Sequence, residues 1–342
     1  MSRHRIAVIG LGMAVTPHAR SLLDLEDRVE VAYAFSRSEG RRRAFAERFD
    51  FPTTGDLERI ASDGSVDAVM ILAPPNAHLE LVQRFAGAGK HILLEKPLER
   101  SSARAVRLVE AAEAAGIKLG VVFQHRFREA SERLRTLLRE GALGELAVAN
   151  VISPWWRPQG YYDEPGRGTL ARDGGGVLIT QAIHALDLLL SLTGPVAEVA
   201  ATAGTTRLHR MDTEDFAGAG LRFANGAYGA LIATTAEYPG FPERIELIGT
   251  KGTAILTAGL LTLHHQDGRE ARFGEEQGTG GGADPMAFPH DAHRALLTDF
   301  LDAIDQDRSP RVTGREALRV HHFIDAVLRA AAEGRTVTLE HG

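Results

Sequence analysis

The sequence contains no cysteine among its 342 residues, which excludes disulfide frameworks, thiolate metal centres, iron–sulfur clusters and cysteine nucleophiles. This absence is compatible with a reducing cytosol, and we expect a cytoplasmic protein. The sequence also has no excess of positive charge, because 39 Lys and Arg residues and 45 Asp and Glu residues give a formal net charge of −6. Such a chain has no bulk basic field for nucleic-acid phosphates or anionic lipid, so we expect neither nucleic acid nor a membrane as partner.

Long apolar runs are missing as well. No stretch reaches about 18 uninterrupted apolar residues, the length that a membrane-spanning helix requires. The longest candidate, residues 177–192, contains Gln181, His184 and Asp187, and we predict a buried helix there. Gly10 and Gly12 interrupt the apolar run near the N-terminus, so we do not interpret that run as a signal peptide.

The first 122 residues alternate short apolar runs with amphipathic stretches, in a chain whose length suggests two domains. Strands are predicted at 6–9, 29–35, 66–72, 91–94 and 117–122, and helices at 16–25, 39–48, 76–88 and 101–115. Continuously apolar strands that alternate with helices favour a parallel sheet covered on both faces. We therefore predict an α/β domain with a doubly wound parallel sheet over residues 1–122.

After residue 123 strands follow one another, which predicts an α+β domain with a large, mainly antiparallel sheet over residues 123–342. Asn225-Gly226 is a strong hairpin signal between two of these strands. The C-terminal helix is a candidate to pack back on the first domain. The expected strands are 146–152, 196–204, 215–223, 227–235, 244–248 and 253–257, the helices 127–139, 177–192, 291–307 and 314–333, and the long loops 153–176 and 267–289.

A glycine pair, Gly10-Leu11-Gly12, follows the first strand and precedes the first helix. Gly10 permits a tight turn, and Gly12 lets the backbone approach a pyrophosphate at the helix N-terminus. Val15 stands where the dinucleotide pattern has Gly or Ala. The alternative is a plain strand-to-helix turn that needs glycine for a positive φ, but the opening strand–turn–helix context favours a dinucleotide site.

The end of the second strand carries hydroxyl and guanidinium groups where an NAD enzyme would carry an acid for the ribose diol. Ser36-Arg37-Ser38 is followed by Arg41, Arg42 and Arg43. Because these groups suit a 2′-phosphate, we predict NADP in preference to NAD. For Arg42 and Arg43 a solvated helix face is the favoured interpretation, and Arg37 is the better candidate for the phosphate.

Two segments carry the residues that we expect to do chemistry. Glu95-Lys96-Pro97 lies at the carboxyl end of a strand, where open α/β sheets bind ligands. On the helix 177–192, His184 belongs to a polar stripe that begins at Thr180. His184 is either a core histidine held by Asp187 or a group that faces a cleft. Hydride transfer from an alcohol needs a base for the hydroxyl proton. We predict His184 as that acid/base and Lys96 as the group that polarises or relays at the reacting oxygen.

Five motifs together resemble the Gfo/Idh/MocA oxidoreductases over essentially the whole chain: Gly10-Leu-Gly12, Ala73-Pro-Pro-Asn-Ala-His78, Glu95-Lys-Pro97, Gln124-His-Arg-Phe127 and Gly174-Gly-Gly176 followed by His184-Ala-Leu-Asp187. The resemblance implies a Rossmann domain, catalytic roles for Lys96 and His184, a homodimer or homotetramer, and NAD(P)-dependent chemistry on sugars, inositols or cyclic diols. The expected cofactor contacts are Gly10, Gly12, Met13, Ser36, Arg37, Arg41, Ala73, Pro74, Asn76, His78, Glu95, Lys96 and Gln124.

One position departs from the family's inositol and sugar dehydrogenases, many of which have Asp four residues before the histidine. Here that residue is Thr180, which makes inositol a doubtful substrate. The combination of Tyr161-Tyr162, Arg167-Gly-Thr169 and Asp173-Gly-Gly-Gly176 is more similar to members that act on sugar acids, nucleotide sugars or dihydrodiols. Arg126 either faces the cleft or pairs with Glu129, and one of Trp155 and Trp156 is expected to fill the core. The expected substrate contacts are Arg126, Trp156, Arg157, Tyr162, Arg167, Thr180 and Gln181.

Histidine pairs such as His264-His265 and His321-His322, and the pair His290 and His293, lack a metal-protease spacing, so we expect no metal. The leading prediction is an NAD(P)-dependent oxidoreductase that transfers a hydride to or from a secondary alcohol or ketone of a small polyol or sugar-like substrate. An NAD(P)-dependent glycosidase or lyase that oxidises its substrate transiently is the alternative. A dinucleotide-binding protein without catalysis is a third.

Overall fold

The computed structural model describes residues 3–276 and 289–339, and the chain divides into two compact units. The first unit comprises Met1–Val122 and His290–Leu318, and the second comprises Phe123–Pro289 and Arg319–Gly342. The sequence placed residues 290–318 in the second domain. They belong to the first unit because helix α9 (Asp291–Asp305) packs against helix α1 (Val15–Asp24). No helix in the described ranges is long and apolar enough to cross a membrane.

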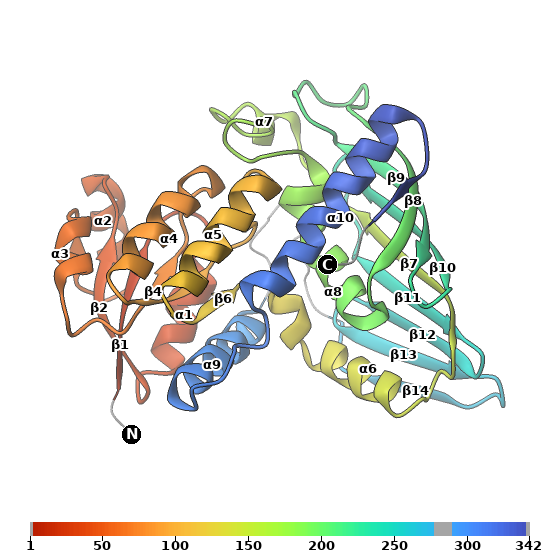
Figure 1. Cartoon of the computed structure of the whole chain (residues 1–342), viewed down its shortest axis with the longest axis horizontal. Helices are drawn as coiled ribbons and strands as arrows, with labels where there is room; N and C mark the ends of the chain where they lie inside the picture. Colours follow the sequence, from red (N-terminus) through yellow and green to blue (C-terminus); the bar gives the residue numbers. More distant parts are fainter. Residues whose placement is uncertain (1–2, 277–288, 340–342) are drawn as a thin grey trace. The chain divides into compact units, whose positions relative to one another are not determined.

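The first unit is built on a six-stranded parallel sheet with the strand order β3-β2-β1-β4-β5-β6 (Figure 1). The predicted doubly wound sheet is confirmed, and only the two-residue strand β3 and the short helix α3 were missed. The bounds are β1 His4–Ile9, β2 Val29–Phe35, α2 Glu39–Ala46, β3 Thr53–Thr54, α3 Leu57–Ser62, β4 Ala68–Ile71, η1 Pro75–Ala77, α4 His78–Gly87, β5 His91–Leu94, α5 Ser102–Ala114 and β6 Leu119–Val121.

The centre of this sheet is buried on both faces. All four residues of β4 are completely buried, as are the last four residues of β1 to within 1%. Both faces of the sheet must therefore be covered by helices. Helix α4 packs against α5, and α1 packs against α9. The strand order reverses between β1 and β4, and ligands of open α/β sheets bind at such a reversal.

The second unit is built on a nine-stranded sheet with the order β14-β13-β12-β11-β7-β10-β9-β8-β15. Only β7 and β10 pair in parallel, so the predicted mainly antiparallel sheet is confirmed. The Asn225-Gly226 hairpin joins β9 to β10 as expected. The strand bounds are β7 Leu146–Pro154, β8 Val196–Gly204, β9 Phe216–Phe223, β10 Tyr228–Thr234, β11 Arg244–Gly249, β12 Gly252–Thr257, β13 Leu260–His265, β14 Glu270–Phe273 and β15 Val337–Thr338.

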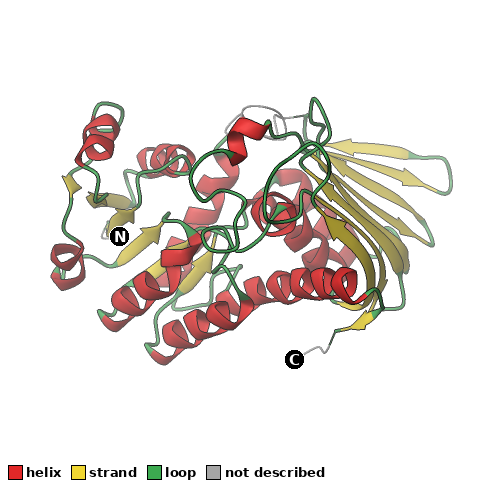
Figure 2. Ribbon diagram, turned by 90° about the horizontal axis from the view of Figure 1, so that it is seen from above, coloured by secondary structure: helices red, strands yellow, loops and turns green. Residues whose placement is uncertain are grey.

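Helices of this unit lie along one face of the curved sheet (Figure 2). The helices of this unit are η2 Gln124–Phe127, α6 Glu129–Arg139, α7 Gln159–Tyr162, the π-helical turn η3 Leu178–Ala182, α8 Ile183–Thr193 and the second part of α10, whose bounds are Gly314–Glu333. Among them, α8 packs on β7, and α6 packs on β12 and β13. Part of the predicted loop 267–289 is in fact strand β14, which pairs with β13, and residues 277–288 lie outside the described ranges. On β10, Tyr228 and Ile232 are 65% and 41% exposed.

Candidate functional site

The glycine turn after β1 has the geometry that a dinucleotide requires. Gly10 has a φ of +111°, and a Cβ on it would lie 2.8 Å from the carbonyl group of Leu72. Gly12 has no such neighbour within 4 Å, so its backbone faces open space. The turn leads directly into α1 beside the reversal of strand order. These residues fit a pyrophosphate at the N-terminus of α1.

The end of β2 is organised around Arg42, which the sequence assigned to a solvated helix face. This assignment was wrong, because the guanidinium of Arg42 donates to the carbonyl oxygens of Ser36 at 2.6 Å and Arg37 at 3.2 Å. The hydroxyl of Ser38 accepts from the backbone N–H of Arg41 and caps α2. The side chains of Arg37 and Arg41 are exposed, so both are available to an incoming anion.

His78 does not fit the expected cofactor contact. Its side chain is completely buried, with Nε2 2.7 Å from the carbonyl oxygen of Ala73 and Nδ1 3.0 Å and 3.1 Å from those of Pro97 and Leu98. Burial lowers the pKa of His78, and the carbonyl groups oppose this shift. A ring with no accessible surface cannot reach a ligand, so His78 instead joins the segment after β4 to the segment after β5.

The Glu95-Lys96-Pro97 segment follows β5, and the Lys96–Pro97 peptide bond is cis. Oε2 of Glu95 accepts a hydrogen bond from the backbone N–H of Lys96 at 3.0 Å. Its Oε1 lies 2.7 Å from Nε2 of His18, a buried residue of α1 that the sequence reasoning missed. The carboxylate of Glu95 therefore fixes the backbone at Lys96.

The other expected cofactor contacts differ in exposure. Met13 is 49% exposed, Pro74 and Asn76 are exposed, and Ala73 is partly buried. Gln124 belongs to the second unit and is buried, with no hydrogen-bond partner for its Oε1 in the described part of the chain. An amide oxygen of this kind can accept a hydrogen bond from a ligand.

His184 lies in the first turn of α8, directly after the π-helical turn η3, and is 7% exposed. Its ring stacks on that of His125 at a centroid distance of 4.8 Å, and the ring of Phe123 meets it edge-on at 5.9 Å. Nδ1 of His125 lies 3.4 Å from a carboxylate oxygen of the buried Glu243. His184 is therefore an aromatic-packed imidazole with a defined orientation. Turns of π-helix are frequently found at functional sites.

Asp187, one turn further along α8, is bound by Arg126. The Nε and Nη2 atoms of Arg126 donate to the two carboxylate oxygens of Asp187 at 2.7 Å and 2.6 Å. The two side chains are 8% and 1% exposed. Arg126 thus forms a buried bidentate ion pair that joins η2 to α8, with a partner that the sequence reasoning did not assign to it.

Glu214, which the sequence reasoning missed, holds the start of η3. Its two carboxylate oxygens accept from the backbone N–H groups of Gly176 and Leu178, both at 3.1 Å. Burial raises the pKa of Glu214, although the hydrogen bonds from these backbone groups lower it in part. A Cβ on Gly176 would lie 1.8 Å from the carbonyl oxygen of Glu214, so only glycine fits there.

Tyr161 is the centre of the polar network before α8. Its hydroxyl accepts from Nη1 of Arg167 at 2.8 Å and from Nε2 of Gln181 at 3.4 Å. The guanidinium carbons of Arg167 and Arg157 lie 4.2 Å and 5.6 Å from the centre of its ring. The hydroxyl of Thr180 contacts the amide oxygen of Gln181. The structure thus brings together four of the expected substrate contacts, with Tyr161 rather than Tyr162 between them.

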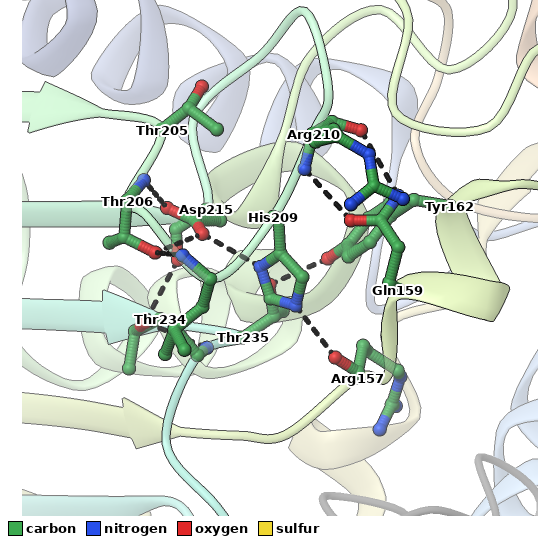
Figure 3. Close-up of polar contacts among 12 residues, drawn as sticks. Arg157, Gln159, Tyr162, Thr205, Thr206, His209, Arg210, Asp215, Thr234 and Thr235 are labelled. Carbon is green, nitrogen blue, oxygen red and sulfur yellow. Dashed lines mark hydrogen bonds and ion pairs between the residues drawn. The ribbon is translucent and has the colours of Figure 1, made fainter.

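Tyr162 belongs to the structural network that Figure 3 shows. It is 8% exposed, and its hydroxyl lies 2.6 Å from that of Thr235, so the expected substrate contact is replaced by a buried anchor. Burial raises the pKa of Tyr162. His209 lies beside it, with Nδ1 2.7 Å from the carboxylate of Asp215 and Nε2 2.8 Å from the carbonyl oxygen of Arg157 (Figure 3). These contacts fix the backbone of the loop that carries Arg157.

The two tryptophans of this loop differ in the expected way. Trp155 is 8% exposed and packs under the guanidinium of Arg157 at 5.1 Å. Trp156 is partly exposed and contacts His209 and Tyr238 through its ring. Trp155 therefore fills the core, and Trp156 keeps an accessible face.

Comparison with known proteins agrees with this fold. A family model described as "Oxidoreductase family, NAD-binding Rossmann fold" matches residues 4–123, and the GFO/IDH/MocA C-terminal domain model matches residues 131–255. Myo-inositol 2-dehydrogenase of Thermotoga maritima is 28% identical over 98% of each chain. The 1,5-anhydro-D-fructose reductase of Ensifer adhaerens is 29% identical over 92% of each chain.

Among solved structures, the WlbA dehydrogenase from Bordetella pertussis, in complex with NADH and UDP-GlcNAcA, superposes with a TM-score of 0.85 at 27% identity. The match covers 100% of both chains. Since two models of one family match consecutive parts that make up most of the sequence, and the strand order and glycine turn agree with them, the chain belongs to the Gfo/Idh/MocA family of oxidoreductases with an NAD-binding Rossmann domain.

Proposed function

We propose that this chain transfers a hydride between C4 of a nicotinamide and a secondary alcohol or ketone of a sugar-like substrate that carries an anionic group. One observation carries the choice of an anionic substrate. The guanidinium groups of Arg157 and Arg167 both lie against Tyr161, whose hydroxyl is bound by Gln181, three residues before His184. Paired guanidinium groups bind carboxylates and phosphates in preference to neutral hydroxyls.

The electrostatics of Arg157 favour the same substrate class. Burial lowers the pKa of Arg157, which means that its surroundings disfavour the cation, and the two neighbouring tyrosines oppose this shift. An anionic group on the substrate would offset the cost of burying this charge. Thr180, in place of the acid found in inositol dehydrogenases, is neutral and therefore does not repel a carboxylate in this region.

The nicotinamide, when bound, accepts or supplies the hydride. In the oxidation direction His184 takes the proton that leaves the substrate hydroxyl, and the packing of its ring between His125 and Phe123 sets its direction. Lys96 donates a hydrogen bond to the reacting oxygen, with its backbone held by Glu95. Gln181 and Thr180 orient the substrate.

We further propose NADP as the preferred cofactor, with Arg37 and Arg41 as the exposed cations for its 2′-phosphate. Fluorescence titration with NADPH and NADH tests this choice. Tighter binding of NADPH is expected, and the Arg37→Glu variant should reverse the preference. Tighter binding of NADH by the wild-type chain would contradict it.

The substrate class is tested with matched pairs of compounds. We expect reduction of NADP with sugar acids or nucleotide-linked sugar acids, and at least about tenfold lower kcat/KM with the corresponding neutral sugars. Arg167→Gln should raise KM for the acid and leave KM for the neutral sugar unchanged. Equal kcat/KM values for the acid and neutral members of each pair would contradict the proposal.

The accessible face of β10, with Tyr228 and Ile232, is our candidate for the contact between copies in a cytoplasmic homodimer or homotetramer. Sedimentation of the wild-type chain and of the Ile232→Lys variant tests it. We expect the variant to sediment as a smaller species.

A further inference from the structure

Three potential metal ligands converge inside the first unit, beside the segment that carries Lys96. They are His18 of α1, Glu95 at the end of β5 and His293 of α9, and one ligand atom from each lies within 4.8 Å of the other two. His18 and His293 are 2% and 3% exposed, and the side chain of Glu95 is 13% exposed. Two imidazoles and one carboxylate therefore share a buried position.

The contacts within this cluster show how closely the three side chains meet. Nε2 of His18 lies 2.7 Å from Oε1 of Glu95. The rings of His18 and His293 meet edge-on, with centroids 5.0 Å apart and planes at 89°. The second imidazole thus approaches the first from the side, as two ligands of one ion do, rather than stacking on it.

The elements that carry the ligands are fastened to one another. Asp24 of α1 accepts from Arg294 at 3.0 Å and lies 2.9 Å from Nε2 of His290, which joins the end of α1 to the start of α9 (Figure 1). Oε2 of Glu95 is held by the backbone N–H of Lys96. Ligands that packing and outer hydrogen bonds orient in advance bind metal more tightly.

We propose that His18, Glu95 and His293 bind a divalent transition-metal ion, for which zinc is the best match. Two imidazole nitrogens and one carboxylate oxygen, with a fourth position for water, are a recurrent zinc ligand set, whereas magnesium and calcium prefer oxygen ligands. Bonds of about 2.0–2.1 Å place tetrahedral ligand atoms roughly 3.3–3.4 Å apart. The ion replaces the direct contact between Nε2 of His18 and Oε1 of Glu95, and these two atoms separate by roughly half an ångström.

The consequence of occupancy lies in the first unit. A bound ion would tie α9 directly to α1 and to the segment before Lys96, so the folded unit gains stability in its presence. The proposal is independent of the proposed function, because it concerns metal binding and not turnover.

The test uses the full chain after treatment with a chelator, with cobalt(II) as a spectroscopic probe and zinc in a thermal-unfolding assay. We expect one equivalent of cobalt(II) to produce a saturable visible absorption band that zinc abolishes, and zinc to raise the unfolding midpoint. His293→Gln should weaken binding by roughly a hundredfold or more, since the loss of an outer-shell partner alone costs 10- to 100-fold. His322→Gln, which removes an exposed histidine of α10 outside the cluster, is the matched control and should bind like the wild type.

A cooperative thermal-unfolding transition without metal establishes that the His293→Gln chain is folded, and a second variant, His18→Gln, should lose the cobalt band in the same way. Absence of a saturable band from the wild-type chain would overturn the proposal and leave a hydrogen-bonded cluster. A band that survives in His293→Gln and His18→Gln, or that is lost in His322→Gln, would place the ion elsewhere and overturn it equally.

Discussion

Asp187→Asn provides the most direct test of how the second unit positions His184. The substitution removes the charge of Asp187 that pairs with the buried guanidinium of Arg126. Both side chains are at least nine-tenths buried, and both hydrogen bonds are shorter than 2.8 Å. Breaking a buried ion pair of this kind costs about 3–5 kcal/mol. At about 2–4 °C per kcal/mol for a unit of this size, the midpoint of thermal unfolding should fall by roughly 6–20 °C.

Tryptophan fluorescence is the appropriate assay, because both tryptophans of the chain, Trp155 and Trp156, lie in the second unit. Denaturation followed in this way reports the unit that contains the ion pair. The exposed pair between Arg222 and Glu198 provides the control, and Arg222→Gln should change the midpoint little.

A double substitution separates the value of the pair from the cost of breaking it. Replacing both partners by apolar residues, Arg126→Met with Asp187→Leu, leaves no charge unpaired and should recover most of the stability that Asp187→Asn loses. The reasoning is refuted if Asp187→Asn costs less than about 1 kcal/mol, or if the double variant is no more stable than the single one.

Three further outcomes follow from the site. Lys96→Ala and His184→Ala should each lower turnover by about a hundredfold or more, because acid–base groups contribute at least this much to the rate. A titration should show that both variants still bind NADPH. Near-full activity of either variant would remove that residue from the mechanism. The pKa of Glu214 is raised above its ordinary value of 4.5, so its contribution to stability is present below that value and is lost as the pH rises through the raised pKa. The unfolding free energy of the wild type relative to Glu214→Gln should therefore fall as the pH rises above about 4.5, and a flat difference contradicts it. Gly10→Ala should destabilise the first unit by roughly 1–3 kcal/mol. Gly12→Ala should leave the unfolding midpoint unchanged and weaken NADPH binding. Equal unfolding midpoints for the two variants would contradict these different roles of the two glycines.

The sequence was sufficient for elements whose signal is local. The apolar run at the end of β1, the glycine turn and the start of α1 were all predicted, because the alternation of side chains and the need for glycine are properties of neighbouring residues. Asn225-Gly226 predicted its hairpin for the same reason. The short strand β3 was missed because two residues carry no periodicity, and β14 was missed because its exposed residues resemble a loop.

The side-chain partners depended on the tertiary structure. From the sequence, Arg126 could face a cleft or pair with Glu129. Only the packing of η2 on α8 brings it to Asp187, which lies 61 residues away in the sequence. The sequence pattern marked His78 as a cofactor contact, but the burial of its ring between two loops makes it a structural link. Tyr161 and Tyr162 are adjacent, and only the fold directs one toward Arg167 and the other into the core.

Local sequence therefore determined most of the longer strands and helices, their order, the family and the glycine turn for a dinucleotide. The tertiary structure decided which polar side chains lie together, such as His18 and Glu95 across 77 residues, and which helix start Glu214 holds. The physical reason is one of range. Backbone conformation responds to the periodicity of neighbouring side chains, whereas an ion pair or a ligand cluster forms only after packed elements bring distant residues within a few ångströms of one another.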